Sequence, residues 1–232
     1  MSIVWIIKKK WYQLSLNPIS PSTALCLAVI LTDLVLSARI GAHFRGDAVM
    51  HITRIRMLHD TGFTNREPFI IFYEMISTYH TNIYHALLAS ITKMLSGNYL
   101  STWYWSLLWA KILIVGAYYF ASWTVFRNKK IAWLTTLFSL VSLAPTYFLN
   151  YPNQIGRHVF LTLTIAFFLQ IWLREKSFAA VFKFACSLLV LCQIHALYAV
   201  YAALCLAPLL AIKLAYQIIK KTWYVCIFRC AG

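Results

Sequence analysis

Acidic residues are scarce in this chain. Its 232 residues include 21 Lys and Arg but only 6 Asp and Glu, and all charged residues together make up 12%, about half the usual share. Hydrophobic residues make up 61%, against roughly 45–50% in a soluble domain. A soluble enzyme of this size could not hide so much apolar surface, and a disordered chain would need far less of it. The basic residues are spread between apolar runs, so the net charge of +15 does not indicate nucleic-acid binding.

Cysteine and glycine exclude two further classes. The six cysteines form no C-x-x-C pair and mostly lie in or beside apolar runs, which predicts buried free thiols rather than a disulfide framework or a zinc site. There are only 7 glycines and no duplicated segment, which argues against a transporter built from repeats and broken helices. An all-α polytopic membrane protein is the fold class that remains.

Six apolar runs reach or approach the roughly 20 residues needed to cross a bilayer. They predict one transmembrane domain over residues 22–219, with residues 1–21 as the N-terminus and residues 220–232 as a tail. A seventh run, residues 83–95, is too short to cross and is predicted to be an interfacial helix. The six runs are residues 22–40, 102–126, 131–149, 158–173, 178–194 and 196–219, the last split by Pro208.

Lysine clusters predict the orientation. Lys8, Lys9 and Lys10 precede the first run, and no small-residue cleavage site follows it, which is typical of an uncleaved signal anchor with a cytoplasmic N-terminus. With six spans, every later lysine cluster falls on the cytoplasmic side, as the positive-inside rule requires. Residues 41–82 then form a long outer loop.

This outer loop holds four of the six acidic residues, two of which are Asp47 and Asp60. Gly46 and Asp47 predict a helix start and Gly62 a stop. Asp47 and His51 are four residues apart, so they share one helix face and could share a metal ion or a proton. The alternative is that Asp47 caps the helix by accepting backbone N–H bonds.

Several other polar residues have more than one interpretation. His80 and His85 could bind a substrate or ion, or could be interfacial packing residues among tyrosines. Lys111, inside the second run, is functional by default in a membrane, unless its stem snorkels outward. Asp33 could pair with Lys111 or Lys183, or be protonated. His195 lies at the outer end of the fifth run, level with Asp47.

The outer side carries arginine where the inner side carries mostly lysine. Arginine suits bidentate contact with phosphate or carboxylate, although solvated arginines beside lipid headgroups would give the same pattern. If the loop forms a site, Asp47, Arg157 and His195 should meet at one cavity. The predicted outer arginines are Arg39, Arg45, Arg54, Arg56, Arg66 and Arg157.

The predicted order is an anchor span, a large outer loop with an early Asp, an interfacial helix and then spans with short loops. This order resembles that of the GT-C superfamily of membrane glycosyltransferases. This superfamily includes protein O-mannosyltransferases, oligosaccharyltransferases and aminoarabinose transferases. Residues 46–55 (GDAVMHITRI) are similar to the first-loop motif of bacterial members. Residues 79–85 (YHTNIYH) are similar to the motif that opens the juxtamembrane helix, and residues 151–156 (YPNQIG) lie in the next outer loop.

The resemblance implies transfer of a sugar from a polyprenyl-phosphate lipid to an acceptor outside the cytoplasm, usually with inversion. It implies Asp47 as the base that takes the acceptor's proton, and cations that hold the departing phosphate. The implied partners are the lipid-linked sugar and the bilayer, without nucleic acid, and a bacterial inner membrane is favoured over the endoplasmic reticulum. The implied substrate-binding residues are Arg54, Arg56, Lys111, Arg157, His80, His85 and His195. Some members also use a divalent ion, Mg²⁺ or Mn²⁺, and the residues implied to bind it here are His51 and Glu74.

Two features depart from the family pattern. Many members carry a second acidic residue beside the first, where this chain has Ala48. Relatives also usually have more spans and often a soluble outer domain. A catalytically inactive or truncated GT-C-like protein is therefore the alternative hypothesis, and a transporter subunit is the third.

Overall fold

The computed structural model describes residues 20–42, 44, 46–62, 82–95, 97–143, 149–173 and 178–230, with the side chains of the last helix described as far as Lys213 and at two positions beyond. All regular structure in these ranges is helical, which confirms the predicted all-α class. The helices are α2 (Pro21–Ile40), α3 (Asp47–Thr61), α5 (Ile83–Met94), α6 (Tyr99–Phe126), α7 (Lys129–Leu143), α8 (Pro152–Ile155), the π-helix η1 (Gly156–Leu161), α9 (Thr162–Leu173), α10 (Phe178–Ile194) and α11 (Ala196–Cys230).

Four of the described helical segments are long and apolar enough to cross a membrane. They are α2, α6, the continuous segment Pro152–Leu173, and Ala196–Lys213 within α11. Helix α10 is apolar but has 17 residues, and α7 has 15. The prediction of a membrane protein is thus supported, whereas the count of six spans is not confirmed. Pro208 lies inside α11 without splitting it.

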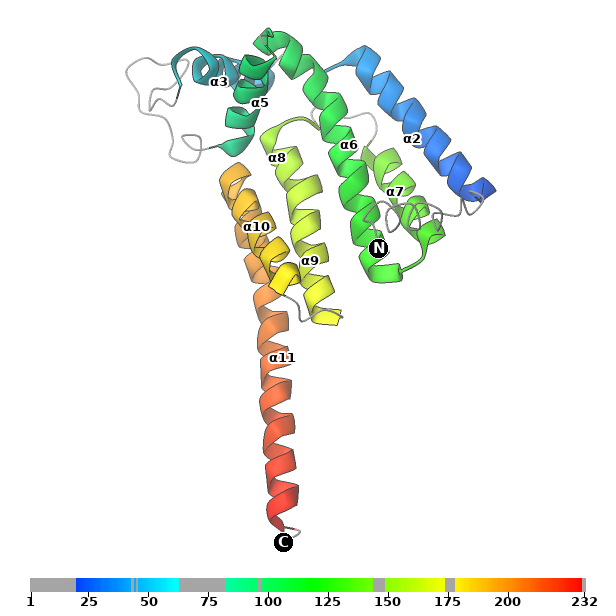
Figure 1. Cartoon of the computed structure of the whole chain (residues 1–232), viewed down its shortest axis with the longest axis vertical. Helices are drawn as coiled ribbons and strands as arrows, with labels where there is room; N and C mark the ends of the chain where they lie inside the picture. Colours follow the sequence, from blue (N-terminus) through cyan, green and yellow to red (C-terminus); the bar gives the residue numbers. More distant parts are fainter. Residues whose placement is uncertain are drawn as a thin grey trace, which may run out of the picture.

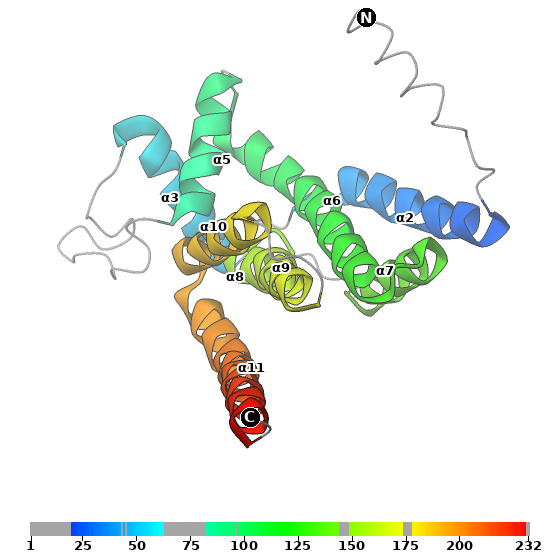
Figure 2. The same cartoon turned by 60° about the horizontal axis from the view of Figure 1, so that its bottom comes forward.

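The helices alternate in direction. In Figure 1, α2, α7 and α10 run upward, whereas α6, α9 and α11 run downward. Helix α6 packs against α2, α7 and α9. Helices α3 and α5 pack against each other at the upper end of the bundle in both views (Figures 1 and 2). Because consecutive long helices are antiparallel, the segments predicted to share the outer side lie at one end of the bundle.

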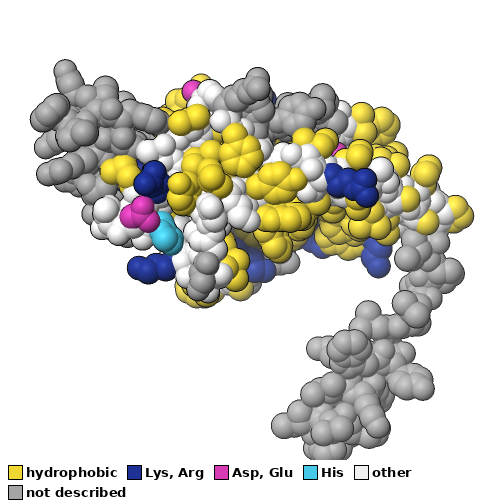
Figure 3. Space-filling view, turned by 90° about the horizontal axis from the view of Figure 1, so that it is seen from above, with side chains coloured by type: hydrophobic (Ala, Val, Ile, Leu, Met, Phe, Trp, Pro, Cys, Tyr) yellow, Lys and Arg dark blue, Asp and Glu magenta, His cyan; other side chains and the backbone are white. Residues whose placement is uncertain are grey.

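Large apolar side chains cover much of the bundle's exterior. Leu25, Phe138 and Leu204 are each about two-thirds exposed, and Figure 3, seen from the α3–α5 end, shows mostly apolar side chains and few acidic ones. Exposed apolar surface on this scale is costly in water but suits contact with lipid. The interior of α6 combines Trp103 and Ile114 with the small residues Ala110 and Ala117, and small residues let helices approach closely in a membrane.

An ion pair joins two of the candidate spans. Lys111 Nζ on α6 donates to both carboxylate oxygens of Asp33 on α2, at 2.7 and 2.9 Å. The prediction that Asp33 pairs with Lys111 is therefore confirmed, and the alternative that Lys111 snorkels away from the bundle is wrong.

The end of α2 is fixed against α6 by a close contact. Gly41, which ends α2, has φ 67° and ψ −175°, and the ring of Tyr104 occupies the space that a Cβ would need there. The Tyr104 hydroxyl donates to the Arg39 carbonyl at 2.7 Å. The Ala42 N–H donates in turn to the Tyr104 carbonyl at 3.0 Å. The chain therefore enters the segment before α3 at a defined position on α6.

Candidate functional site

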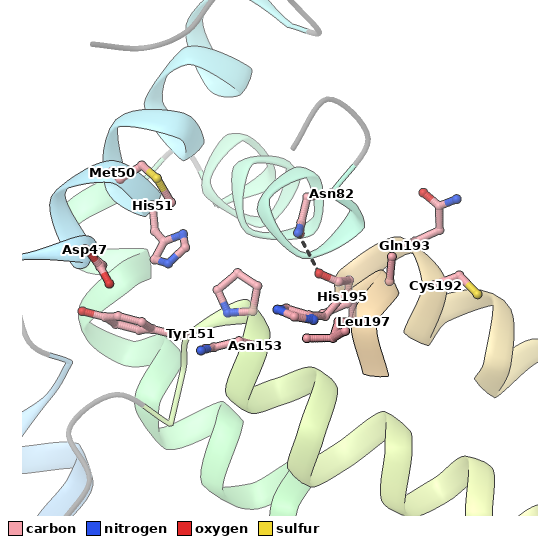
Figure 4. A pocket seen from close by; sticks show the side chains of 13 residues that line it. Asp47, Met50, His51, Asn82, Tyr151, Asn153, Cys192, Gln193, His195 and Leu197 are labelled. Carbon is pink, nitrogen blue, oxygen red and sulfur yellow. Dashed lines mark hydrogen bonds between the residues drawn. The ribbon is translucent and has the colours of Figure 1, made fainter. Parts of the chain in front are cut away.

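A cavity of about 440 Å³ lies where α3, α5, α8 and the junction of α10 with α11 meet (Figure 4). Helices distant in sequence contribute to it, so it exists only in the folded chain. Many of its side chains are polar or aromatic, and Asp47 is the single carboxylate among the described lining residues. These residues are Asp47, Met50, His51, Asn82, Tyr151, Pro152, Asn153, Cys192, Gln193, Ile194, His195, Ala196 and Leu197.

Asp47 opens helix α3. The N-cap is Gly46, at φ 61° and without a side-chain cap bond, so the capping alternative for Asp47 does not hold. Asp47 instead occupies the first turn, where the helix dipole stabilises a negatively charged side chain. Within the described residues its carboxylate makes no hydrogen bond or ion pair, and it lines the cavity beside His51. The predicted start and stop of this helix are confirmed, since Gly62 ends it at φ 77°.

Asn82 fixes the start of α5 to the end of α10. Its Oδ1 accepts the backbone N–H groups of Tyr84 and His85, at 3.1 and 3.4 Å, and so caps α5. Its Nδ2 donates to the Ile194 carbonyl at 3.0 Å. This single side chain closes one wall of the cavity. The sequence-based prediction did not include Asn82, although an Asn directly before an apolar helix is a recognised N-cap signal.

The opposite wall comes from the segment that precedes η1. Gly156, the first residue of the π-helix, approaches the α10–α11 junction so closely that a Cβ there would lie 3.2 Å from His195 Cβ and 3.3 Å from the Tyr198 ring. π-helical turns are rare and frequent at functional sites. Pro152 and Asn153 of the YPNQIG string line the cavity just before this turn.

Two buried histidines form a pair at the cavity, with His51 in its lining and His85 behind it. His51 Nδ1 lies 2.9 Å from His85 Nε2, and the two rings stack with centroids 5.1 Å apart. His85 is fully buried. Tyr151 meets His51 edge-on at 4.9 Å, and Trp103 stacks on it at 5.8 Å. The predicted contact of His85 with substrate is therefore wrong, because His51 and its aromatic neighbours separate it from the cavity.

Burial keeps these imidazoles uncharged. It lowers the pKa of His51 to about 4, against the opposing attraction of Asp47. Burial, with the charges of His51 and Arg54 adding to it, holds the pKa of His85 well below its usual value. Burial also lowers the pKa of His195. At neutral pH the imidazoles that line the cavity, His51 and His195, are therefore uncharged.

The four cationic residues among the predicted substrate-binding residues, which were candidates to hold the phosphate, do not line the cavity. Arg54 is buried within α3, and Arg56 faces outward, where its Nε lies 3.5 Å from an Asp60 oxygen. Lys111 is bound to Asp33. Arg157, on η1, is exposed. The structure thus brings Asp47 and His195 together as predicted, but not Arg157 with them.

The remaining predicted site residues are His80, as a substrate ligand, and His51 and Glu74, as metal ligands. His80 and Glu74 lie outside the described residues, as do Arg45 and Arg66. Within the described part of the chain, no three His, Cys, Asp or Glu side chains converge as a metal site would require. One nitrogen of His51 is occupied by His85, and Asp47 with the other nitrogen supplies too few ligands to hold a divalent ion without further groups.

The chain was compared with known protein families, with characterised proteins and with solved structures, and none of these comparisons finds a match.

Acidification should destabilise the protein through the His51–His85 pair. The pKa of His51 is about 4 when folded and near 6.5 when unfolded, so between these values the unfolded chain binds more protons. The free energy of unfolding is therefore largest above pH 6.5 and falls as the pH drops towards 4, by about 3 kcal/mol from His51, with His85 acting in the same direction. Thermal or denaturant unfolding in detergent at a series of pH values measures this.

The matched control replaces both imidazoles, as His51→Asn with His85→Gln. This double variant should lose the part of the pH dependence between 6.5 and 4 that His51 and His85 contribute, while His195, whose pKa burial also lowers, keeps its own contribution. If it keeps the dependence of the unsubstituted protein, other groups cause it.

Proposed function

We propose that this protein is a membrane glycosyltransferase of the GT-C type, and that the cavity binds its acceptor and the transferred sugar. The observation that carries the proposal is the placement of Asp47. In a chain with 6 acidic residues, one carboxylate opens a helix and faces a cavity at one end of the bundle, and it makes no hydrogen bond or ion pair with the described residues. A carboxylate in that position can accept a proton from a bound hydroxyl.

In the proposed reaction Asp47 takes the proton of the acceptor hydroxyl. The acceptor oxygen forms a bond to the anomeric carbon of the sugar while the bond from that carbon to the phosphate oxygen breaks. The electron pair of the broken bond leaves with the lipid phosphate, and attack from the opposite face inverts the anomeric configuration. The donor bond is already activated, so the protein needs chiefly to position the two substrates and to accept one proton.

The charge of the cavity supports placing the acceptor there rather than the phosphate. None of its described lining residues is Lys or Arg, whereas stabilising a departing phosphate calls for cations. We assign phosphate contact to Arg157 because it is exposed and directly follows Gly156, the residue packed against His195. Lys111 is less suited to that role because it is bound to Asp33, and Arg56 lies beside Asp60 on the exposed face of α3.

The test is Asp47→Asn in a transfer assay with purified protein in nanodiscs and a panel of radiolabelled polyprenyl-phosphate sugars. Loss of a general base costs about 100-fold or more in turnover, and the amide keeps the shape of the side chain. Asp60→Asn is the matched control, because Asp60 lies on the same helix but pairs with Arg56 and His59 at the surface. It should retain activity.

Two outcomes would count against the proposal. Unchanged turnover in Asp47→Asn would refute the role of Asp47. Absence of turnover by the unsubstituted protein with every donor in the panel would favour the alternative of an inactive GT-C-like protein.

A further inference from the structure

The hydrogen bond between His51 and His85 can be made in two ways, and they leave different groups facing the cavity. Each neutral imidazole carries one proton, and one of the two nitrogens 2.9 Å apart must supply it. If His51 Nδ1 donates, its Nε2 is left as a bare acceptor. If His85 Nε2 donates, His51 carries its proton on Nε2 and is left as a donor.

The environment of His85 decides between the two. His85 Nδ1 is buried and has no hydrogen-bond partner in the described part of the chain. If His85 accepted from His51, its own proton would have to sit on Nδ1 and would be a buried N–H without an acceptor, which folded proteins nearly always avoid. If His85 donates, the unpartnered atom is a lone pair, which costs less. The positive charge of Arg54, which acts on His85, also favours a lone pair there over an additional proton.

The cavity side of His51 is then defined. Its Nδ1 is held by His85, so Nε2 is the ring nitrogen left for a ligand. His51 lines the cavity together with Asp47, one turn away on the same face of α3, and no hydrogen bond between the two side chains occupies that nitrogen within the described residues. Trp103 and Tyr151 pack against the His51 ring.

We propose that His85 is a positioning residue that fixes His51 in its Nε2–H form, so that His51 offers an uncharged donor to an oxygen of the bound sugar or acceptor beside the Asp47 carboxylate. Asp47 and His51 then form a matched pair, an acceptor and a donor one helical turn apart. Such a pair can hold a hydroxyl-bearing ligand by its hydrogen and by a neighbouring oxygen at once. The ligand class is a neutral polyol, and this part of the inference rests on the proposed function.

The first test reads the proton positions directly. In protein labelled with ¹⁵N-histidine and held in nanodiscs, the ring nitrogens of His51 are assigned by their loss in His51→Asn. We expect His51 to be protonated at Nε2 and not at Nδ1, with Nδ1 coupled through the hydrogen bond to the protonated Nε2 of His85. Protonation of His51 at Nδ1 would overturn the proposal. This measurement needs no enzymatic activity, so it stands even if the protein transfers no sugar.

The second test compares two replacements of similar size. His85→Gln keeps an N–H donor near the position of His85 Nε2, whereas His85→Met fills the same volume without one. We expect His85→Met to lower kcat on the order of 10- to 100-fold with little change in KM, because the His51 donor is misplaced, and His85→Gln to retain most of the activity. A purely structural role would lower the unfolding temperature of both variants and leave their kcat values alike, which would overturn the proposal.

Failure of the proposed function is distinguishable from failure of this inference. If the unsubstituted protein shows the expected protonation but no transfer, the glycosyltransferase assignment is wrong and the tautomer assignment is right. If transfer depends on Asp47 but His51 is protonated at Nδ1, the glycosyltransferase assignment is right and the tautomer assignment is wrong.

Discussion

Asp33→Asn is expected to lower the free energy of unfolding by about 3–5 kcal/mol, the cost of removing one partner from a buried ion pair. The substitution leaves the Lys111 ammonium, whose side chain is only 10% exposed, without its carboxylate. A lone charge among membrane-spanning helices has few alternatives there. Lys111→Met should have a comparable effect by leaving Asp33 alone. Reversible unfolding in mixed micelles measures both.

The double replacement Asp33→Leu with Lys111→Met separates the ion pair from the packing around it. Replacing both partners by apolar groups is often neutral, so this variant should be more stable than either single variant. Lys183→Met is the control for loss of a lysine from an apolar helix, because Lys183 is exposed on α10, and it should have little effect. A double variant no more stable than the single variants would show that the two charges do not stabilise each other.

Gly41→Ala is the second substitution with a large expected effect. A Cβ at Gly41 would overlap the ring of Tyr104, and that ring is held in place by the bond from its hydroxyl to the Arg39 carbonyl. The backbone of Gly41, at φ 67° and ψ −175°, also lies in a region that is essentially restricted to glycine. Strain of about 1–3 kcal/mol and overpacking of about 1–3 kcal/mol should together destabilise the contact between α2 and α6 in unfolding measurements.

Gly62→Ala supplies the matched control. Gly62 has a similar backbone conformation, φ 77° and ψ −156°, but a Cβ there meets no atom within 4 Å among the described residues. The difference between the two variants therefore isolates the overlap with Tyr104. Equal destabilisation would mean that backbone strain alone accounts for both.

The sequence predicted local elements well where a physical rule acts on neighbouring residues. Gly46 and Gly62 marked the ends of α3, and Asp47 and His51 were placed on one helix face by their spacing. The run at residues 83–95 became α5 (Ile83–Met94). The count of six spans is not confirmed, because α7 and α10, with 15 and 17 residues, fall short of the roughly 20 residues of a typical span.

Long-range pairings could at most be narrowed by the sequence. For Asp33 the sequence left Lys111, Lys183 or protonation open, and the fold selected Lys111. The arginines had many possible environments, and only the fold showed that Arg56 turns to Asp60 and that Arg157 does not line the cavity. The placement of His85 behind His51, and the bond from Asn82 to Ile194, likewise depend on how α3, α5 and α10 pack.

The sequence by itself determined the all-helical class, the apolar runs typical of a membrane protein and the concentration of the few acids before α5, since hydrophobicity and charge are properties of composition and order. Only the tertiary structure decided which of the polar residues share a cavity, which are paired with one another and which histidine is shielded from it. Those outcomes depend on side chains more than 30 positions apart, such as His51 and His85. Burial and orientation at that separation are set by packing and not by local spacing.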